Sequence, residues 1–227
     1  MVVGGGLIAS AFLNSGEDFN NYIIFASGVS NSKEINRNEF KRERDLILKT
    51  ISNNKGSKFI YFSSILAGVS DDMYYEHNLE MEQLVRDSTT NNIIFKLPQI
   101  IGGIGNCNNL VNYMVNSIRE GKELTIYKDI KRALLDVDDL VRLVNYTKDK
   151  VNCETINISH VELIDVIELY FMLEGILKKC VSTKIIDVNE TNWFSENHPV
   201  INEGITSLGI KKIDYTYNVL KKYIKWN

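Results

Sequence analysis

Short apolar runs alternate with longer helix-like stretches, and this alternation constrains the fold more than any other feature of the sequence. The apolar runs expected to form buried strands are Val2–Val3, Tyr22–Ala26, Lys58–Phe62 and Asn92–Leu97. The stretches with helical spacing between them are Leu7–Leu13, Asn36–Ser52 and Met73–Arg86. Strands that alternate with helices are typical of a parallel sheet with helices on its faces. The chain is therefore expected to be an α/β protein.

The second half of the chain continues with shorter strands. Its expected helices are Leu110–Arg119, Val161–Lys179 and Tyr215–Trp226. Its expected strands are Leu124–Ile126, Thr155–Ile158 and Thr183–Val188. Because ligands of parallel α/β sheets bind at the carboxyl ends of the strands, we expect the functional site at that edge.

Charge and composition exclude several classes of function. The formal net charge of −3 argues against a nucleic-acid-binding protein with a broadly basic surface. No apolar run reaches the roughly 18 residues that a membrane helix needs. The apolar start is interrupted by three glycines and has no Lys or Arg before it, so we expect no signal peptide. These features favour a cytoplasmic protein without a membrane or nucleic-acid partner.

No metal-binding pattern is evident. The cysteines lie far apart without a CxxC pair, and the histidines lack ligand spacing: Cys107, Cys153, Cys180, His77, His160 and His198. Asp136, Asp138 and Asp139 are interpreted as the N-terminal cap of a helix rather than as a metal cluster. We therefore expect no metal, and cysteines in a reducing compartment.

A glycine-rich turn follows the first apolar run. Gly4, Gly6 and Ala9 fit the dinucleotide pattern GxGxxG, in which Ala can take the last position. Glycine is needed where backbone approaches a pyrophosphate, and the N-terminus of the next helix attracts negative charge. The alternative is a plain strand-to-helix turn. A dinucleotide site also places an acidic residue after its second strand, whereas Tyr22–Ala26 is followed by Ser27–Gly28.

A serine at a strand end and a tyrosine on the next helix suggest carbonyl chemistry. Ser63 and Ser64 end the third apolar run, and Tyr74 shares a helix face with Asn78. A tyrosine hydroxyl can give or take the proton of a carbonyl oxygen, and a serine can hydrogen-bond the same oxygen. We expect these roles for Ser64 rather than Ser63 and for Tyr74 rather than Tyr75. The alternative is that these residues only end a strand and pack against the core.

In this order along the chain, the motifs resemble the extended short-chain dehydrogenase/reductase family of nucleotide-sugar epimerases, dehydratases and 4-ketoreductases. Gly4–Ala9 resembles the family's glycine turn, Ile24–Gly28 its fourth strand, and Phe59–Ser64 the strand that carries its serine. Tyr74–Glu82 resembles its Tyr-x-x-x-Lys helix, and Lys96–Gly102 resembles the loop that lies against the nicotinamide. Asn108–Leu110 resembles its nucleotide contact, and Arg132–Leu140 resembles the motif whose Arg binds the diphosphate. The resemblance covers most of residues 1–145 and extends more loosely over 155–227.

The resemblance implies roles for individual residues. The implied catalytic residues are Ser64, Tyr74 and Asn78. The implied contacts to NAD or NADP are Gly4, Gly6, Leu7, Ile8, Ala26, Ser27, Gly28, Ser63, Leu97 and Pro98. The implied contacts to the substrate are Asn109, Leu110 and Arg132. The resemblance also implies a dinucleotide-binding domain at 1–145, with 103–135 contributing to the substrate site. A small C-terminal α/β cap at 146–227 and a homodimer through the helices at 36–52 and 73–86 follow from it too.

Two departures from the family pattern stand out. Asn78 occupies the position of the family's Lys and carries no charge to lower the pKa of Tyr74. Only residues 7–21 separate the glycine turn from the strand Tyr22–Ala26, so two strands of the first half are missing. The usual strand order 3-2-1-4-5-6 is then shortened to 1-4-5-6, and the first strand becomes an edge.

These observations support an NAD(P)-dependent enzyme that acts on a nucleotide-activated sugar, with a 4-keto-sugar reductase as the simplest reaction. Ser64-Ile65-Leu66 lacks the Asp-Glu pair of the dehydratases, whereas an epimerase stays open. NADPH is slightly favoured over NADH for a reductase. Asn78 and the missing strands support a different class, a degenerate relative that binds a nucleotide or nucleotide sugar as a regulatory or scaffolding module. A partner subunit that completes the site is a third option.

Overall fold

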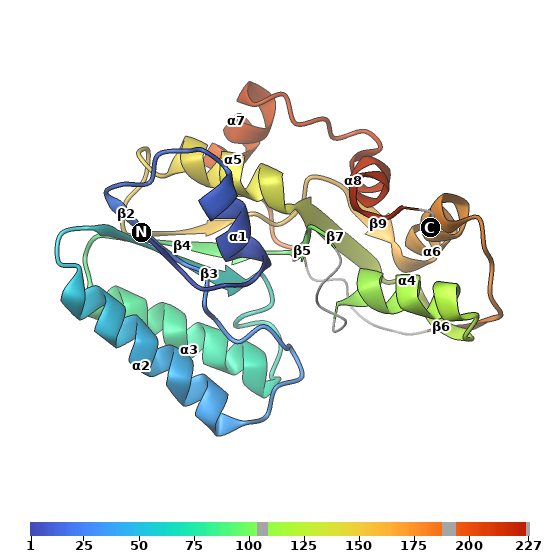
Figure 1. Ribbon diagram of the computed structural model, residues 1–227, viewed down its shortest axis with the longest axis horizontal. Coiled ribbons are helices and arrows are strands. Elements are labelled where there is room, and N and C mark those ends of the chain that lie inside the picture. Colours follow the sequence, from blue (N-terminus) through green and yellow to red (C-terminus); the bar gives the residue numbers. More distant parts are fainter. Residues whose placement is uncertain (104–108, 188–193, 226–227) are drawn as a thin grey trace.

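The centre of the computed structural model is a five-stranded parallel sheet (Figure 1). The structure describes residues 1–103, 109–187 and 194–225. In their order across the sheet, the strands are β1 (Val2–Val3), β2 (Tyr22–Phe25), β3 (Lys58–Ser64), β4 (Asn92–Leu97) and β8 (Glu154–Asn157). Every neighbouring pair runs parallel. The expected α/β, Rossmann-like sheet is therefore confirmed.

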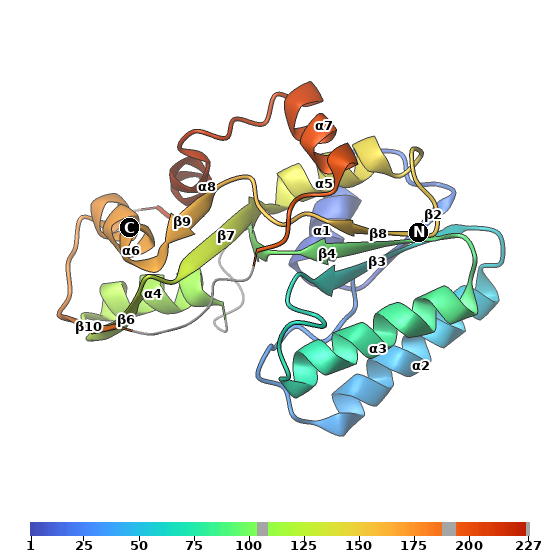
Figure 2. The same ribbon diagram turned by 180° about the vertical axis from the view of Figure 1, so that it is seen from behind.

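Helices cover both faces of this sheet. They are α1 (Leu7–Asn14), α2 (Arg37–Asn53), α3 (Met73–Ser88) and α5 (Val137–Thr147). α2 and α3 lie on one face, and α1 and α5 lie on the other (Figures 1 and 2). Successive residues of a strand point to opposite faces. In β3, Phe59 and Tyr61 therefore join the cluster beneath α2 and α3, whereas Ile60 joins the larger cluster on the other face.

The connection between β1 and β2 has an unusual hand. The units β2–α2–β3 and β3–α3–β4 step across the sheet in one direction with their helices on the same face. The unit β1–α1–β2 steps in the same direction but has its helix on the opposite face. Its crossover is therefore of the opposite hand to those of the other two units. About 98% of such crossovers are right-handed because strand twist and helix hand favour that path. This connection therefore needs a specific explanation.

A shortened first half explains the unusual hand. In a doubly wound sheet, the strand after the first helix pairs on the other side of the first strand, which places that helix on the face that α1 covers here. When two strands are missing, the helix keeps its face while the chain steps to the opposite neighbour. Within the described part of the chain, β1 has no strand on its outer side. The expectation that β1 is an edge strand is confirmed.

The second half adds smaller units beside the sheet. The additional strands are β5 (Gln99–Ile101), β6 (Leu124–Lys128), β7 (Lys131–Asp136), β9 (Leu163–Asp165) and β10 (Thr183–Asp187). The additional helices are α4 (Leu110–Glu120), α6 (Val166–Leu177), α7 (Pro199–Ser207) and α8 (Tyr215–Tyr223). β5, β7 and β9 form one small sheet, and β6 pairs with β10.

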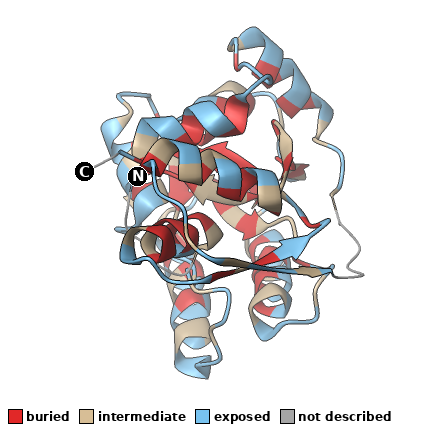
Figure 3. Cartoon of the chain, turned by 90° about the vertical axis from the view of Figure 1, so that its right-hand side faces the viewer, coloured by how far each residue is buried: buried red, intermediate tan, exposed pale blue. Residues whose placement is uncertain are grey.

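One continuous cluster of buried side chains runs from Phe12 of α1 to Leu220 of α8. The helices turn their buried sides inward and their exposed sides to the surface (Figure 3). The segment 146–227 also supplies β8 to the central sheet. The division into units at 1–145 and 146–227 stays a prediction.

Several expected boundaries were wrong. The helix expected over Val161–Lys179 begins only at Val166, because Leu163–Asp165 pairs with β7 and Asp165 caps the helix in a capping box with Glu168. The helix expected over Tyr215–Trp226 ends at Tyr223, and Trp226 lies outside the described residues. The strands β5, β7 and β9 and the helix α7 were not expected from the sequence.

Cys153 and Cys180 are free thiols, and Cys107 also lies outside the described residues.

A substitution in the glycine turn tests its backbone requirement. Gly4 has φ +131°, and a Cβ there would lie 2.2 Å from the carbonyl oxygen of Ala26. We expect Gly4→Ala to lower the free energy of unfolding by about 1–3 kcal/mol, because it adds backbone strain and a collision with β2. Gly5→Ala is the matched control, since nothing lies within 4 Å of a Cβ there. Urea unfolding of both variants measures the difference, and equal stabilities would contradict this account.

Candidate functional site at the carboxyl edge of the sheet

The strand register brings the predicted site residues to one edge. Val3 pairs with Phe25, Phe25 pairs with Tyr61, and Ser64 pairs with Leu97. Because the four strands are parallel and in this register, their carboxyl ends lie side by side. The segments that follow β1, β2, β3 and β4 contain most of the predicted cofactor contacts.

The glycine turn gives the edge an open helix N-terminus. Ala26 N–H donates to the carbonyl of Val3 (2.8 Å), so the end of β2 lies directly against the turn and excludes a side chain at Gly4. Gly6 caps α1 without a side-chain hydrogen bond, and the space around a Cβ at Gly6 is open. The first N–H groups of a helix lack intrahelical partners and favour anions. The residues present therefore fit the pyrophosphate of a dinucleotide.

The segment after β4 packs against the starts of two helices. A Cβ at Gly102 would lie 2.5 Å from the Val137 side chain and 2.9 Å from Leu7. Gly102 therefore lets this segment approach both α5 and the predicted cofactor contact Leu7. Ile8, one residue later, is half-buried against the main core. The predicted contacts Leu97 and Pro98 are both buried.

Sequence reasoning missed one polar group on this segment. The Nε2 atom of Gln99 is buried without a hydrogen-bond partner among the described residues. Buried donors are nearly always satisfied, so an unpaired amide nitrogen at the start of β5 marks a position where a bound molecule could accept a hydrogen bond. A polar residue directly after Leu97–Pro98 was the available signal.

The two serines at the end of β3 have different surroundings. Ser63 donates to the carboxylate of Glu82 (2.6 Å), which is 1% exposed and also contacts Arg86 (3.0 Å) and Lys96 (3.4 Å). Ser63 is therefore tied to α3 beneath the sheet. By strand alternation, Ser64 faces the opposite side, where it is half-buried and its hydroxyl accepts only the N–H of Leu66 (3.2 Å) among the bonds of the described residues.

Tyr74 and Asn78 lie close together on α3. The Asn78 amide donates to the backbone carbonyl of Tyr74 (3.0 Å), and Asn78 is 5% exposed. Burial raises the pKa of the Tyr74 hydroxyl, a hydrogen bond from the Asn78 side chain opposes this rise, and Tyr75 and Glu43 add to it. Asn78 thus supplies a hydrogen bond beside Tyr74 but no positive charge.

The predicted substrate contacts lie on α4 and β7. Asn109 caps α4 by accepting the N–H of Asn112 (2.8 Å), Leu110 begins that helix, and Asn108 lies outside the described residues. Arg132 of β7 is half-buried and donates to the carbonyl of Lys131 (2.8 Å). Burial and the Asp72 carboxylate raise the pKa of Tyr75, whereas the positive charge of Arg132 lowers it, so this guanidinium lies near enough to α3 to act on Tyr75. That proximity was not expected from the sequence.

The acidic cluster is a helix cap, as expected. Asp136 accepts the N–H of Asp138 (3.0 Å) at the start of α5. Lys222 of α8 pairs with Asp136 (2.6 Å) and Asp138 (2.7 Å), and Tyr215 donates to Asp139 (2.9 Å). These carboxylates therefore hold α8 against α5. A search of the described residues finds no group of three or more residues arranged to hold a metal ion.

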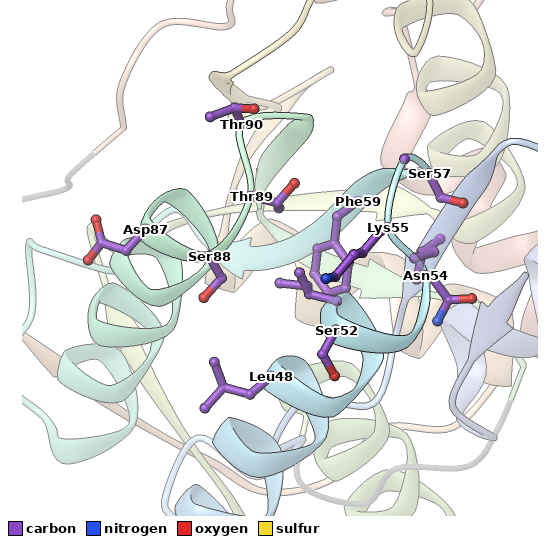
Figure 4. Close-up of a pocket in the computed structure, with 13 residues that line it drawn as sticks. Leu48, Ser52, Asn54, Lys55, Ser57, Phe59, Asp87, Ser88, Thr89 and Thr90 are labelled. Atoms are coloured by element: carbon purple, nitrogen blue, oxygen red, sulfur yellow. The ribbon is translucent and has the colours of Figure 1, made fainter.

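A cleft lies away from this edge. It has a volume of about 640 Å³ and opens between the C-terminal ends of α2 and α3 (Figure 4). Ile23 and Phe59, near the amino ends of β2 and β3, line it together with Lys55 and Asp87. It therefore does not coincide with the predicted site.

Solved structures share this fold at low sequence identity, whereas no protein-family model and no curated protein matches the sequence. The Bordetella bronchiseptica enzyme WbmH in complex with NAD+ is 14% identical (TM-score 0.72), covering 95% of this chain and 78% of that one. UDP-glucuronic acid 4-epimerase from Bacillus cereus in complex with NAD is 18% identical (TM-score 0.68; coverage 89% and 71%). dTDP-glucose 4,6-dehydratase from Bacillus anthracis in complex with NAD is 13% identical (TM-score 0.66; coverage 89% and 73%). The chain therefore has the fold of the NAD-dependent nucleotide-sugar epimerases and dehydratases.

Paired substitutions at the end of β3 test the different surroundings of the two serines. We expect Ser63→Ala to lower the free energy of unfolding by about 1–3 kcal/mol, because it removes a hydrogen bond from a buried carboxylate. Ser64→Ala should change it by less than about 0.5 kcal/mol, since that hydroxyl has only a local partner. Thermal and urea unfolding of the two variants provide the comparison. A larger loss for Ser64→Ala would refute the assignment of Ser63 to the α3 side.

Proposed function

We propose that the chain is an NAD(P)-dependent oxidoreductase that reduces the 4-keto group of a nucleotide-activated sugar. The observation that carries the proposal is the position of Tyr74 and Asn78 on the helix that follows the strand ending in Ser64, in a sheet whose first strand is followed by an open glycine turn. A proton donor, a hydrogen-bonding serine and an anion-binding helix end are the groups that carbonyl reduction by a dinucleotide requires.

The chain's own residues would handle the proton and the carbonyl. The bound NAD(P)H supplies the hydride. Tyr74 would donate its phenolic proton to the keto oxygen, and Ser64 would hydrogen-bond the same oxygen and orient it. Because Ser64 faces away from α3, this oxygen would have to lie across the carboxyl end of β3. Asn78 would hold the Tyr74 end of the helix through its amide. Fixed donors of this kind stabilise the negative charge that develops on the oxygen.

The surroundings of Tyr74 favour reduction over epimerisation. An epimerase must first oxidise a hydroxyl, which requires the tyrosine to take up a proton as tyrosinate. Burial raises the Tyr74 pKa most, Tyr75 and Glu43 raise it further, and the hydrogen bond from the uncharged Asn78 side chain opposes this rise only in part. A tyrosine that stays protonated suits the role of acid.

The proposed cofactor contacts surround the glycine turn and the end of β2. Gly4 and Gly6 would face the pyrophosphate, while Ala26, Ser27 and Gly28 would border the dinucleotide. Three solved structures with this fold are complexes with NAD, so NAD is the first cofactor to test. No comparison supports the preference for NADPH.

The proposed substrate site uses residues of α4 and β7. Arg132 would pair with the diphosphate, because a guanidinium fork matches phosphate oxygens. Asn109 and Leu110 would contact the nucleotide. Two structures that share the fold contain UDP-glucuronic acid with NAD and UDP-glucose, which supports this class of substrate.

A homodimer through α2 and α3 belongs to the same proposal. Leu48 of α2 is 39% exposed and Leu79 of α3 is 44% exposed, so both helices present apolar side chains outward.

None of the helices in the described ranges is long and apolar enough to cross a membrane.

Two observations favour a second candidate function, a binding module without turnover. Asn78 lacks the charge that would lower the Tyr74 pKa, and among the described residues no strand lies on the outer side of β1, where the strand that reads the adenosine ribose would lie. Such a module would bind a nucleotide sugar but would not oxidise NADH.

Calorimetry distinguishes the two candidates. We expect the protein to bind NADH and a UDP- or dTDP-sugar, and Arg132→Ala to weaken sugar-nucleotide binding about tenfold while NADH binding stays unchanged. Arg44→Ala on the exposed side of α2 is the matched control. Binding of the sugar nucleotide without NADH would favour the module, and an unchanged affinity in Arg132→Ala would remove that residue from the site.

Restoring the family's charge at position 78 tests Tyr74 as the acid. We expect Asn78→Lys to raise turnover of a 4-keto-sugar nucleotide with NADH, because a nearby ammonium lowers the Tyr74 pKa towards the working pH. The active form is protonated, so activity is lost as pH rises through this pKa. The alkaline loss should therefore occur at lower pH in Asn78→Lys than in the wild type. Gln83→Lys on the exposed side of α3 is the control, and identical pH profiles would exclude Tyr74 as the acid.

A further inference from the structure

Glu43 of α2 is a buried carboxylate that the proposed chemistry does not use. It is 1% exposed, and its two oxygens contact donors from the loop after β2, from β3 and from α3. A buried charge is costly unless it is paired and hydrogen-bonded. Three donors satisfy this carboxylate, and each belongs to a segment that borders the predicted site.

The first contact fixes the loop after β2. The N–H of Val29 donates to Glu43 Oε2 (2.8 Å). A Cβ at Gly28 would lie 3.2 Å from Glu43 Oε1, so the carboxylate lies directly against the loop backbone. The neighbouring Arg42 donates to the carbonyl of Ser27 (3.2 Å). The loop that holds the proposed cofactor contacts is therefore anchored by α2.

The second contact reaches the helix that carries Tyr74. His77 Nε2 lies 3.2 Å from Glu43 Oε2, and its ring stacks on Phe40 of α2 with 4.6 Å between the ring centres. His77 is 6% exposed and lies between Tyr74 and Asn78 in the chain. One oxygen of Glu43 thus joins the cofactor loop to α3.

The third contact reaches the strand that ends in the predicted serine. The Tyr61 hydroxyl donates to Glu43 Oε1 (2.8 Å), and both side chains are about 1% exposed. Burial and the Glu43 charge raise the pKa of Tyr61, so its hydroxyl stays a donor. Tyr61 lies two residues before Ser63 on β3.

We infer that Glu43 is a positioning residue that sets the cofactor loop 26–29 relative to the helix of Tyr74. This inference rests on the proposed function. The hydride donor held by the loop and the proton donor on α3 must be kept in one geometry, and small displacements reduce rates strongly. One carboxylate oxygen contacts both the loop, at Val29 (2.8 Å), and α3, at His77 (3.2 Å), so a shift of either segment is transmitted to the other through this single side chain. No other carboxylate of the described residues has hydrogen bonds both to this loop and to α3.

Glu43→Gln tests the coupling, because it keeps the shape and removes the charge. We expect faster hydrogen exchange at Val29 and about tenfold weaker NADH binding, since one charge-assisted hydrogen bond to the loop is lost. Turnover should fall as well. Asp45→Asn is the matched control, because Asp45 is an exposed carboxylate on the same helix that pairs with Lys41 and not with the loop.

His77→Phe separates the two arms of the coupling. It keeps a ring against Phe40 but removes the donor from α3, so Glu43 still binds the loop. We expect kcat to fall at least several-fold while the NADH dissociation constant stays within twofold of the wild type. A residue that only stabilised the fold would change both in parallel. Because this variant does not depend on the folding of Glu43→Gln, it keeps the inference testable if that protein unfolds.

The outcomes distinguish this inference from the proposed function. If wild-type protein does not bind NADH, the proposed function fails, and hydrogen exchange at Val29 in Glu43→Gln still decides whether the carboxylate holds the loop. If the wild type binds NADH but Glu43→Gln and Asp45→Asn have the same affinity for NADH and the same hydrogen exchange at Val29, the inference is overturned. Equal changes of kcat and NADH affinity in His77→Phe would also overturn it.

Discussion

Two buried carboxylates, Glu43 and Glu82, hold the helices of one face against the carboxyl edge of the sheet. Glu82 binds Ser63 of β3, Lys96 of β4 and Arg86 of its own helix, and Arg86 donates onward to Thr155 of β8 (2.8 Å). Glu43 binds α3, β3 and the loop after β2. Apolar packing fixes the distance between a helix and the sheet, but it does not prevent the helix from sliding along the strands. Directional hydrogen bonds to the two buried carboxylates fix the position of α2 and α3 along the strands, and the arrangement of the predicted site residues depends on that position.

The missing strands leave β1 as the outer strand of the central sheet, next to the predicted site. β1 has only two residues, so it presents few unpaired backbone groups along its outer side, which is one way in which proteins protect sheet edges. α1 nevertheless stays on the face that a complete dinucleotide-binding half would give it, with Phe12 packed against Phe19 and Phe62. The open turn before α1 is thus retained, whereas the described residues form no strand beyond β1, where a complete dinucleotide-binding half has the strand that reads the adenosine ribose.

The sequence predicted the central fold well because local patterns encode it. Buried strands of parallel sheets are continuous apolar runs, and Gly6 and Asp136 are the N-cap residues of α1 and α5, of residue types that helix N-termini favour. The sequence could not reveal the strand pairing of Leu163–Asp165 with β7, since an apolar stretch fits a helix or a strand equally. It also missed Glu43, which lies in a charged helix where most side chains are solvated. Only the tertiary fold shows which charge is buried.

The balance of charges around Tyr74 connects the fold with the chemistry. A lysine at position 78 would stabilise a tyrosinate, and a reversible enzyme needs both protonation states of its tyrosine. Here an uncharged amide occupies that position, and the Glu43 carboxylate is a negative charge that raises the Tyr74 pKa. Burial and Glu43 raise the cost of forming a tyrosinate, and the hydrogen bond from Asn78 offsets only part of that cost. In the proposed reaction a tyrosinate forms when the proton passes to the keto oxygen, so these surroundings keep Tyr74 protonated before the reaction but make it a weaker acid than a tyrosine beside a lysine.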